Sequence, residues 1–150
     1  MYKYLFKGKV KPDNAVCALL VYDKKILLQK RDNKKNIFFP GHYGLFGGAL
    51  NKGETKEKGL IREIKEELDI KVNIKKLKYL TSLVLDFSRL GFKKYNRSFF
   101  VINLQKKEVK KIKLYEGEKK IWIKKREVYF KRKLVPYDAF AIWLYLFNKS

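Results

Sequence analysis

A dense group of acidic residues lies in the middle of a strongly basic chain. The protein carries a formal net charge of +22, from 37 Lys and Arg against 15 Asp and Glu. Six of those acids nevertheless lie within residues 54–69: Glu54, Glu57, Glu63, Glu66, Glu67 and Asp69. Carboxylates this close in sequence repel one another unless positive charge lies among them. The spacing therefore suggests that the segment binds a cation.

The acidic segment has the hydrophobic periodicity of a helix over residues 55–68, with Thr55 as a plausible N-cap. At about 100° per residue, a core-facing stripe is formed by Leu60, Ile61, Ile64 and Leu68. Spacings of three and four residues place on an adjoining stripe the acids Glu63, Glu66 and Glu67. Gly59 lies on the acidic side, where its missing side chain would let a ligand approach closely.

Carboxylates arranged in this way suit a hard divalent cation such as Mg²⁺, which takes oxygen ligands and retains waters and substrate phosphates. Zn²⁺ would prefer His or Cys, and neither lies nearby, while Ca²⁺ usually binds in a loop. The alternative is a solvated helix face on which Arg62 and Lys65 soften the repulsion.

The segment GGALNKGE directly upstream favours the metal site. Gly47 and Gly48 permit unusual backbone angles and close approach of a phosphate or a metal ion. Glu54 and Arg62 carry opposite charges, so they can pair and fix the loop to the helix. Together, these residues indicate a loop and helix that hold a divalent metal against phosphates.

This pattern resembles the Nudix box, G-x5-E-x7-R-E-U-x-E-E-x-G-U, in which U is a bulky apolar residue. Its fixed positions are matched by Gly48, Glu54, Arg62, Glu63, Ile64, Glu66, Glu67 and Ile70. Asp69 replaces the last glycine. That position follows the helix, where a left-handed C-cap is common, and Asp tolerates this conformation better than most residues. The chain is therefore similar to Nudix proteins of the broad MutT-like type.

The resemblance implies an α/β fold, with a mixed β-sheet layered between helices as an α/β/α sandwich, and one domain over residues 1–150. It implies a Nudix pyrophosphohydrolase, an acid anhydride hydrolase that uses Mg²⁺ or Mn²⁺ to cleave the pyrophosphate linkage of a nucleoside diphosphate derivative. That substrate would be a nucleoside triphosphate, an oxidised nucleotide or a nucleotide sugar. By the same resemblance the metal ligands would be the Gly47 carbonyl and the side chains of Glu63, Glu66 and Glu67. The catalytic set would be Arg62, Glu63, Glu66 and a distal acid, with Gly48 and Glu54 in structural roles.

The distal acid should lie in the segment LYEGEKKIW, which offers Glu116 and Glu118 before Trp122. We favour Glu116, since similar loops place this acid six residues before the tryptophan. It would bind a further metal or act as general base. The alternative is an ordinary charged turn.

The remaining sequence predicts a sheet around this helix. Strand-like runs cover residues 15–22, 25–31, 45–50, 77–87, 98–104 and 120–123, and a loop covers 32–44. A final helix is expected at about 137–147, after Pro136. Substrate-binding residues cannot be named, although a base could stack on an aromatic residue among Phe38, Phe39, Tyr43, Phe46, Tyr95, Phe99 and Phe100; core or surface packing is the commoner use.

Several further expectations concern partners and location. Lysine supplies most of the positive charge and is scattered along the chain, which indicates a general field that attracts anions or simply a compositional bias. An RNA 5′-end pyrophosphohydrolase, or a non-catalytic nucleotide or RNA sensor, is therefore an alternative, and a homodimer is possible. Cys17 should be a buried thiol and His42 a loop residue with a local hydrogen bond. No signal-peptide pattern is present and the apolar run at 139–147 is too short to span a bilayer, so we expect a cytoplasmic protein without membrane contact.

Overall fold

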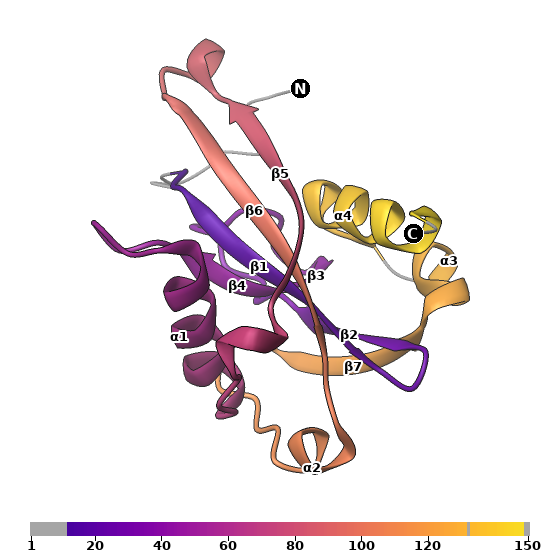
Figure 1. Ribbon diagram of the computed structural model, residues 1–150. Coiled ribbons are helices and arrows are strands. Elements are labelled where there is room, and N and C mark those ends of the chain that lie inside the picture. The colour runs from indigo at the N-terminus through magenta and orange to yellow at the C-terminus, as the bar shows by residue number, and fades with distance from the viewer. Residues whose placement is uncertain (1–11, 132, 149–150) are drawn as a thin grey trace.

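The computed structural model describes residues 12–131 and 133–148, and within these ranges seven strands form one mixed sheet (Figure 1). The central path runs β3-β2-β1-β6-β5, while β4 pairs with β1 and β7 pairs with β2. Only the β1–β6 pairing is parallel among these described strands. The strand bounds are Ala15–Tyr22 (β1), Lys25–Lys30 (β2), Tyr43–Gly44 (β3), Phe46–Ala49 (β4), Lys78–Asp86 (β5), Lys94–Asn103 (β6) and Lys119–Lys124 (β7).

Strand β1 is buried on both faces of the sheet, which explains its continuous apolar sequence. Because side chains alternate along a strand, one face carries Val16, Ala18 and Leu20. The opposite face carries Cys17, Leu19 and Val21. Each face packs against a different hydrophobic cluster, so the sheet lies between two layers.

Those layers are supplied by helix α1 (Lys56–Leu68) and helix α4 (Pro136–Phe147), which lie on opposite sides of the sheet in Figure 1. From α1, Leu60, Ile64 and Leu68 are fully buried in the first cluster. From α4, Ala141 and Ile142 are buried in the second. The predicted mixed sheet between helices is thereby confirmed. Two further α-helices are short, α2 (Lys106–Val109) and α3 (Val128–Lys131).

The longer predicted elements are present with shifted ends, whereas β3, α2 and α3 were not predicted. The strand predicted over 45–50 is shorter, since β4 covers only Phe46–Ala49, and the loop predicted over 32–44 ends in a short strand, β3. Strand β6 begins at Lys94, four residues before the predicted start. Its first half is only partly buried, so the apolar pattern there is weak.

The local expectations for the single cysteine and the single histidine are confirmed. Cys17 is fully buried, and burial raises the pKa of its thiol to about 12. His42 Nδ1 hydrogen-bonds with the carbonyl oxygen of Pro40 at 3.0 Å. Across the described ranges, no helix has both the length and the apolar character needed to cross a bilayer. Residues 1–11, in which no signal-peptide pattern was expected, lie outside the described residues.

Candidate active site

Helix α1 begins and ends as its sequence predicts. The Thr55 side chain accepts a hydrogen bond from the Lys58 amide and caps the first turn. At the other end, Asp69 adopts the left-handed conformation, with φ 57° and ψ 28°. Asp69 also pairs with Lys65 and lies 3.9 Å from Lys113 Nζ, so nearby cations lower the pKa of its carboxyl group. The replacement of glycine by aspartate thus leaves the helix end in the required geometry.

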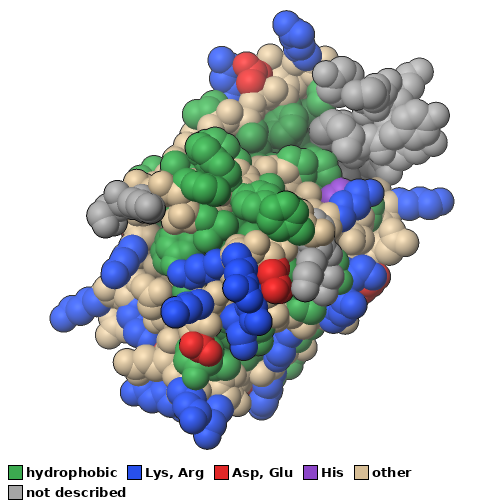
Figure 2. Space-filling model, turned by 90° about the vertical axis from the view of Figure 1, so that its right-hand side faces the viewer, with side chains coloured by type: hydrophobic (Ala, Val, Ile, Leu, Met, Phe, Trp, Pro, Cys, Tyr) green, Lys and Arg blue, Asp and Glu red, His purple; other side chains and the backbone are tan. Residues whose placement is uncertain are grey.

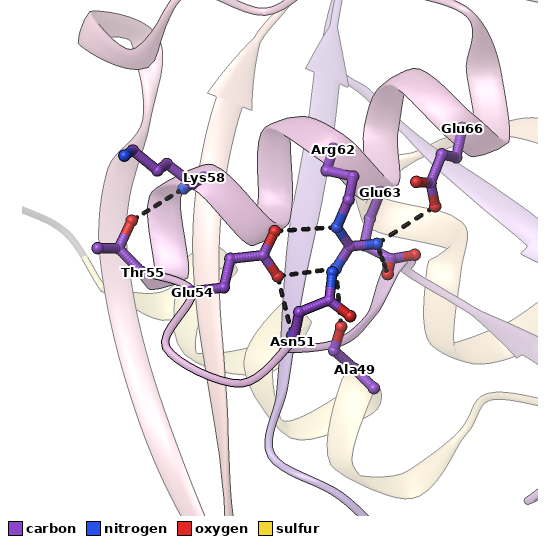
Figure 3. Close-up of polar contacts among 8 residues, drawn as sticks. All are labelled: Ala49, Asn51, Glu54, Thr55, Lys58, Arg62, Glu63 and Glu66. Atoms are coloured by element: carbon purple, nitrogen blue, oxygen red, sulfur yellow. Dashed lines mark hydrogen bonds and ion pairs between the residues drawn. The ribbon is translucent and has the colours of Figure 1, made fainter.

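Arg62 is the hub that joins the loop to the helix (Figure 3). Its Nε and Nη2 each donate to a different carboxylate oxygen of Glu54, both at 2.9 Å, which confirms the predicted ion pair. Nη2 also donates to the Ala49 carbonyl, and Nη1 donates to Glu63 at 2.6 Å and to Glu66 at 3.2 Å. The guanidinium therefore supplies the positive charge that the acidic segment requires. Hydrogen bonds from Arg62 lower the pKa of Glu54 to about 2.

Gly59 has a different role from the one predicted. A Cβ atom at this position would lie 2.3 Å from Leu50 Cδ2 and 3.1 Å from Glu54 Oε2. The glycine therefore makes room for the loop to pack on the helix, and the expectation that a ligand approaches here is wrong. The sequence alone does not distinguish the two roles, since a helical glycine permits close approach of a ligand or of another part of the chain.

Glu63 lies directly against the glycine loop. A Cβ atom on Gly48 would fall 2.5 Å from Glu63 Oε2, so only glycine leaves this carboxylate in place. Its side chain is 15% exposed, compared with 55% for Glu66. Burial raises the pKa of Glu63 despite the opposing effect of Arg62, and the nearby charges of Glu66 and Glu116 act in the same direction as burial.

Glu67 is the most deeply buried carboxylate of the acidic segment, with 2% exposure. Its Oε2 accepts a hydrogen bond from the Gly47 amide at 2.9 Å, and its Oε1 accepts one from Gln29 Nε2 at 3.4 Å. Gln29 also donates to the Leu45 carbonyl, so the amide is fixed between strand and helix. Burial raises the pKa of Glu67 to about 8. Because the hydrogen-bond donors to this buried carboxylate are neutral, a bound cation would compensate its negative charge.

Gly47 requires its missing side chain for a backbone reason. Its φ of 137° is unfavourable for other residues, and a Cβ atom would lie 2.1 Å from the Val16 carbonyl oxygen. Strand β4 can therefore approach β1 closely at the Cys17–Gly47 pair. This approach turns the Gly47 amide toward Glu67.

A cavity of about 610 Å³ opens beside these groups. Its wall includes Gly47, Gly48, Glu63 and Glu67. The distal loop contributes Glu116, whereas Glu118 pairs with Lys30 at 2.5 Å and is not among the lining residues. The Tyr115 amide donates to the Glu67 carbonyl and the Glu118 amide to the Lys30 carbonyl, which anchor the loop on either side of Glu116.

The structure thus brings together only part of the predicted metal set. Glu63, Glu67 and Glu116 share the cavity, while Glu66 is held by Arg62 outside it. Among residues 12–131 and 133–148, no three acidic, histidine or cysteine side chains are grouped closely enough to hold a metal ion. The donors available at the cavity are nonetheless all oxygens, as Mg²⁺ and Mn²⁺ require. The buried Glu67 and the carboxylate of Glu63 against bare glycine backbone fit such an ion.

Other lining residues of the cavity are apolar or basic. Apolar surface is supplied by Ile37, Phe38, Leu85 and Phe87, and positive charge by Arg31, Lys34 and Arg97. Of the aromatic residues proposed for base stacking, Phe38 lines this cavity, with its ring centroid 6.1 Å from that of Phe87. Core positions are instead occupied by Phe46, Phe99 and Phe100.

Arg97 belongs to a buried polar cluster that sequence reasoning missed. Its guanidinium lies over the Tyr137 ring at 4.2 Å, and its Nη2 donates to Cys17 Sγ at 3.1 Å. Asp138 lies behind it, with Oδ1 3.7 Å from Arg97 Nε, and accepts a hydrogen bond from the Leu45 amide. Burial raises the pKa of Asp138 although Arg97 opposes it. The only sequence signal was an arginine next to an apolar run and an aspartate at the start of an apolar helix.

Comparison with known proteins places this site in a family. The family model for the NUDIX domain matches residues 11–142. The chain belongs to the Nudix family. The Nudix and MutT-like resemblance deduced from the box is therefore confirmed.

Curated relatives match part of this chain. The ADP-ribose pyrophosphatase of Methanocaldococcus jannaschii is 44% identical over 66 residues, which cover 44% of this chain and 37% of the relative. Nucleoside triphosphatase NudI of Enterobacter sp. is 38% identical over 63 residues, which cover 42% of this chain and 44% of the relative. The chain thus matches less than half the length of each of these relatives.

Solved Nudix structures match over nearly the whole chain. The MutT protein of Methanosarcina mazei Go1 has a TM-score of 0.73 at 21% identity, covering 95% of this chain and 99% of that one. The MutT Nudix hydrolase of Burkholderia pseudomallei has a TM-score of 0.72 at 23% identity, covering 89% and 98%. These likenesses establish the fold.

Proposed function

We propose that this protein is a divalent-cation-dependent Nudix hydrolase that cleaves the pyrophosphate linkage of a nucleoside diphosphate derivative. The observation that supports this most is the shared cavity: Glu63 and Glu67 of the box and Glu116 of the distal loop line the same space. Its volume of about 610 Å³ lies within the usual range for small-ligand sites. The names of the curated relatives, a pyrophosphatase and a nucleoside triphosphatase, agree with this reaction.

The residues of the chain divide the work as follows. Glu63 and Glu67 would hold the cation, with the Gly47 carbonyl as a further ligand, and Glu66 would join them only by leaving Arg62. When bound, Mg²⁺ or Mn²⁺ would neutralise phosphate charge and act as a Lewis acid. Arg62 keeps Glu63 oriented and remains paired with Glu54.

Proton transfer and phosphate binding fall to other residues that line the cavity. Glu116 would accept the proton of the attacking water, because it lines the cavity, whereas Glu118 is paired with Lys30. Arg31 and Lys34 line the cavity and would bind the anionic oxygens of the substrate and the leaving group. The apolar surface around Phe38 offers a place for the base.

The substrate class that we propose is a small nucleotide: a nucleoside triphosphate, an oxidised nucleotide or a nucleotide sugar. Hydrolysis of a panel of such compounds with Mg²⁺ tests it. We expect phosphate or pyrophosphate release from at least one member, lowered a hundredfold or more in Glu63→Gln, whereas Glu57→Gln on the same helix should retain full activity. Glu66→Gln in the same assay decides whether this residue leaves Arg62 to bind the cation.

Tight nucleotide binding without turnover of any panel member would contradict hydrolysis and favour the sensor. Triphosphorylated RNA belongs in the panel, since release of its terminal phosphates would identify an RNA 5′-end substrate. Cytoplasmic location, organisation of residues 1–150 as one domain and a homodimer remain parts of this proposal, to be tested by fractionation, limited proteolysis and sedimentation.

A further inference from the structure

A group of large aromatic side chains is exposed on the side of the molecule opposite α1. Helix α4 exposes Phe140, Trp143 and Phe147, and the adjacent α3 exposes Tyr129 and Phe130. Phe130 is 88% exposed, Phe147 67% and Trp143 48%. These five residues are called the aromatic face below. Figure 2 shows hydrophobic side chains gathered on this side of the molecule.

The aromatic face has a regular arrangement. Phe140, Trp143 and Phe147 follow one another at helical spacings of three and four, so their rings lie on one side of α4. Ring centroids are 6.1 Å apart for the first pair and 5.8 Å for the second, with interplanar angles of 32° and 35°. The opposite side of the helix already packs on the sheet through Ala141 and Ile142. The rings are therefore surplus to the core.

The two helices that carry the face are joined to each other. Tyr129 Oη donates a hydrogen bond of 2.6 Å to the Ala139 carbonyl oxygen, which links α3 to α4. Tyr137, three residues before Phe140, lines the cavity. The face therefore begins one helical turn from the candidate active site.

A group of lysines lies near the helices that carry the aromatic face. Lys125 Nζ lies 4.6 Å from the Tyr145 ring centre on α4 and donates to its hydroxyl at 2.6 Å. The Lys125 amide bonds to the Lys24 carbonyl, and Lys25 pairs with Lys124 across β2 and β7. Lys125 thus contacts α4, the three other lysines adjoin Lys125 through the backbone, and Figure 2 shows Lys and Arg side chains beside the hydrophobic ones.

We propose that the aromatic face and the nearby lysines bind single-stranded nucleic acid, with bases stacked on the rings and phosphates at the lysines. Every large hydrophobic side chain exposed on the described parts of α3 and α4 is aromatic. Aromatic rings beside positive charge are the arrangement that binds single strands without regard to sequence. A net charge of +22 opposes pairing of two copies and favours an anionic partner. This surface does not depend on hydrolysis at the cavity.

Fluorescence anisotropy with a labelled oligo(dT) or oligo(rU) of about 15 nucleotides tests this, with EDTA present so that turnover plays no part. We expect the wild-type chain to bind single strands more tightly than a duplex of equal length. The double variant W143A/F147A should bind at least tenfold more weakly. Phe130→Ser provides a second variant at a nearly fully exposed position, and Leu90→Ala is the control, since Leu90 is an exposed apolar residue on a different loop.

The lysines require a separate measurement. Lys24→Ala combined with Lys124→Ala should make the salt dependence of binding less steep, while Lys78→Ala on β5 should not. Equal binding of oligonucleotide by W143A/F147A and the wild type would overturn the proposal and leave only the general positive field. If the wild type binds vesicles of anionic phospholipid but no oligonucleotide, and W143A/F147A no longer binds the vesicles, the face would be assigned to membranes. If the wild type sediments as a dimer and W143A/F147A as a monomer, the face would be assigned to a second copy of the chain. Either result overturns the proposal.

Discussion

Replacing Glu67 with glutamine should change how the stability of the metal-free protein depends on pH. In the folded protein the pKa of Glu67 is raised to about 8 from 4.5, because the carboxyl group is buried. The folded state therefore keeps its proton over a range in which the unfolded chain has lost it. Stability from this group is complete below pH 4.5 and declines as the pH rises toward 8.

The size of the effect follows from the same two values. One pKa unit corresponds to about 1.4 kcal/mol. Between pH 5 and pH 8, the wild type should lose about 3 kcal/mol of unfolding free energy through Glu67. Glu63, whose pKa is also raised by burial, contributes in the same direction. The acids with a lowered pKa, including Glu54 and Asp86 at about 2, titrate below this range.

Urea unfolding in EDTA at pH 5 and pH 8 measures this dependence. We expect Glu67→Gln to remove most of the loss of stability seen in the wild type, since an amide cannot ionise. Added Mg²⁺ should stabilise the wild type more at pH 8 than at pH 5, because cation binding favours the ionised carboxylate. A wild-type protein as stable at pH 8 as at pH 5, with an unchanged profile in Glu67→Gln, would refute the reasoning.

Three further substitutions probe the loop, the distal acid and the helix end. Gly48→Ala places a Cβ atom 2.5 Å from the Glu63 carboxylate, which must then move aside. Turnover should therefore fall at least tenfold with little change in melting temperature, and a variant with full turnover would contradict this. Glu116→Gln should lower kcat by about 10²–10⁴, whereas Glu118→Gln should not, and equal effects would remove Glu116 from the reaction. Asp69→Ala should lower the free energy of unfolding, measured with urea, by about 1 kcal/mol, and Asp69→Gly should lower it less. Equal losses in the two variants would show that the left-handed conformation does not matter.

The sequence revealed the parts of the site that are close together in the chain. The pairing of Glu54 with Arg62, the cap at Thr55 and the left-handed Asp69 all follow from spacings within one loop and one helix. Helical periodicity, which depends only on local geometry, also identified the core positions Leu60, Ile64 and Leu68. Ile61, predicted on the same stripe, is only partly buried.

What the sequence could not show depends on pairing between distant segments. Gln29 reaches Glu67 only because β2 lies beside β1 in the sheet, 38 residues away in sequence from the helix that it supports. Arg97 meets Asp138 because β6 runs parallel to β1 beneath α4. The helix pattern placed Glu66 and Glu67 on one stripe, yet tertiary packing buries Glu67 and leaves Glu66 with Arg62.

Binding of Mn²⁺, followed by the loss of the electron paramagnetic resonance signal of the free ion, tests the central claim most directly. Mn²⁺ accepts the same oxygen ligands as Mg²⁺, and the titration needs no substrate. The account predicts saturable binding by the wild type and by Glu57→Gln, and at least tenfold weaker binding by Glu63→Gln and by Glu67→Gln. Binding that is equally tight in all four proteins would contradict a cation site at the Nudix carboxylates.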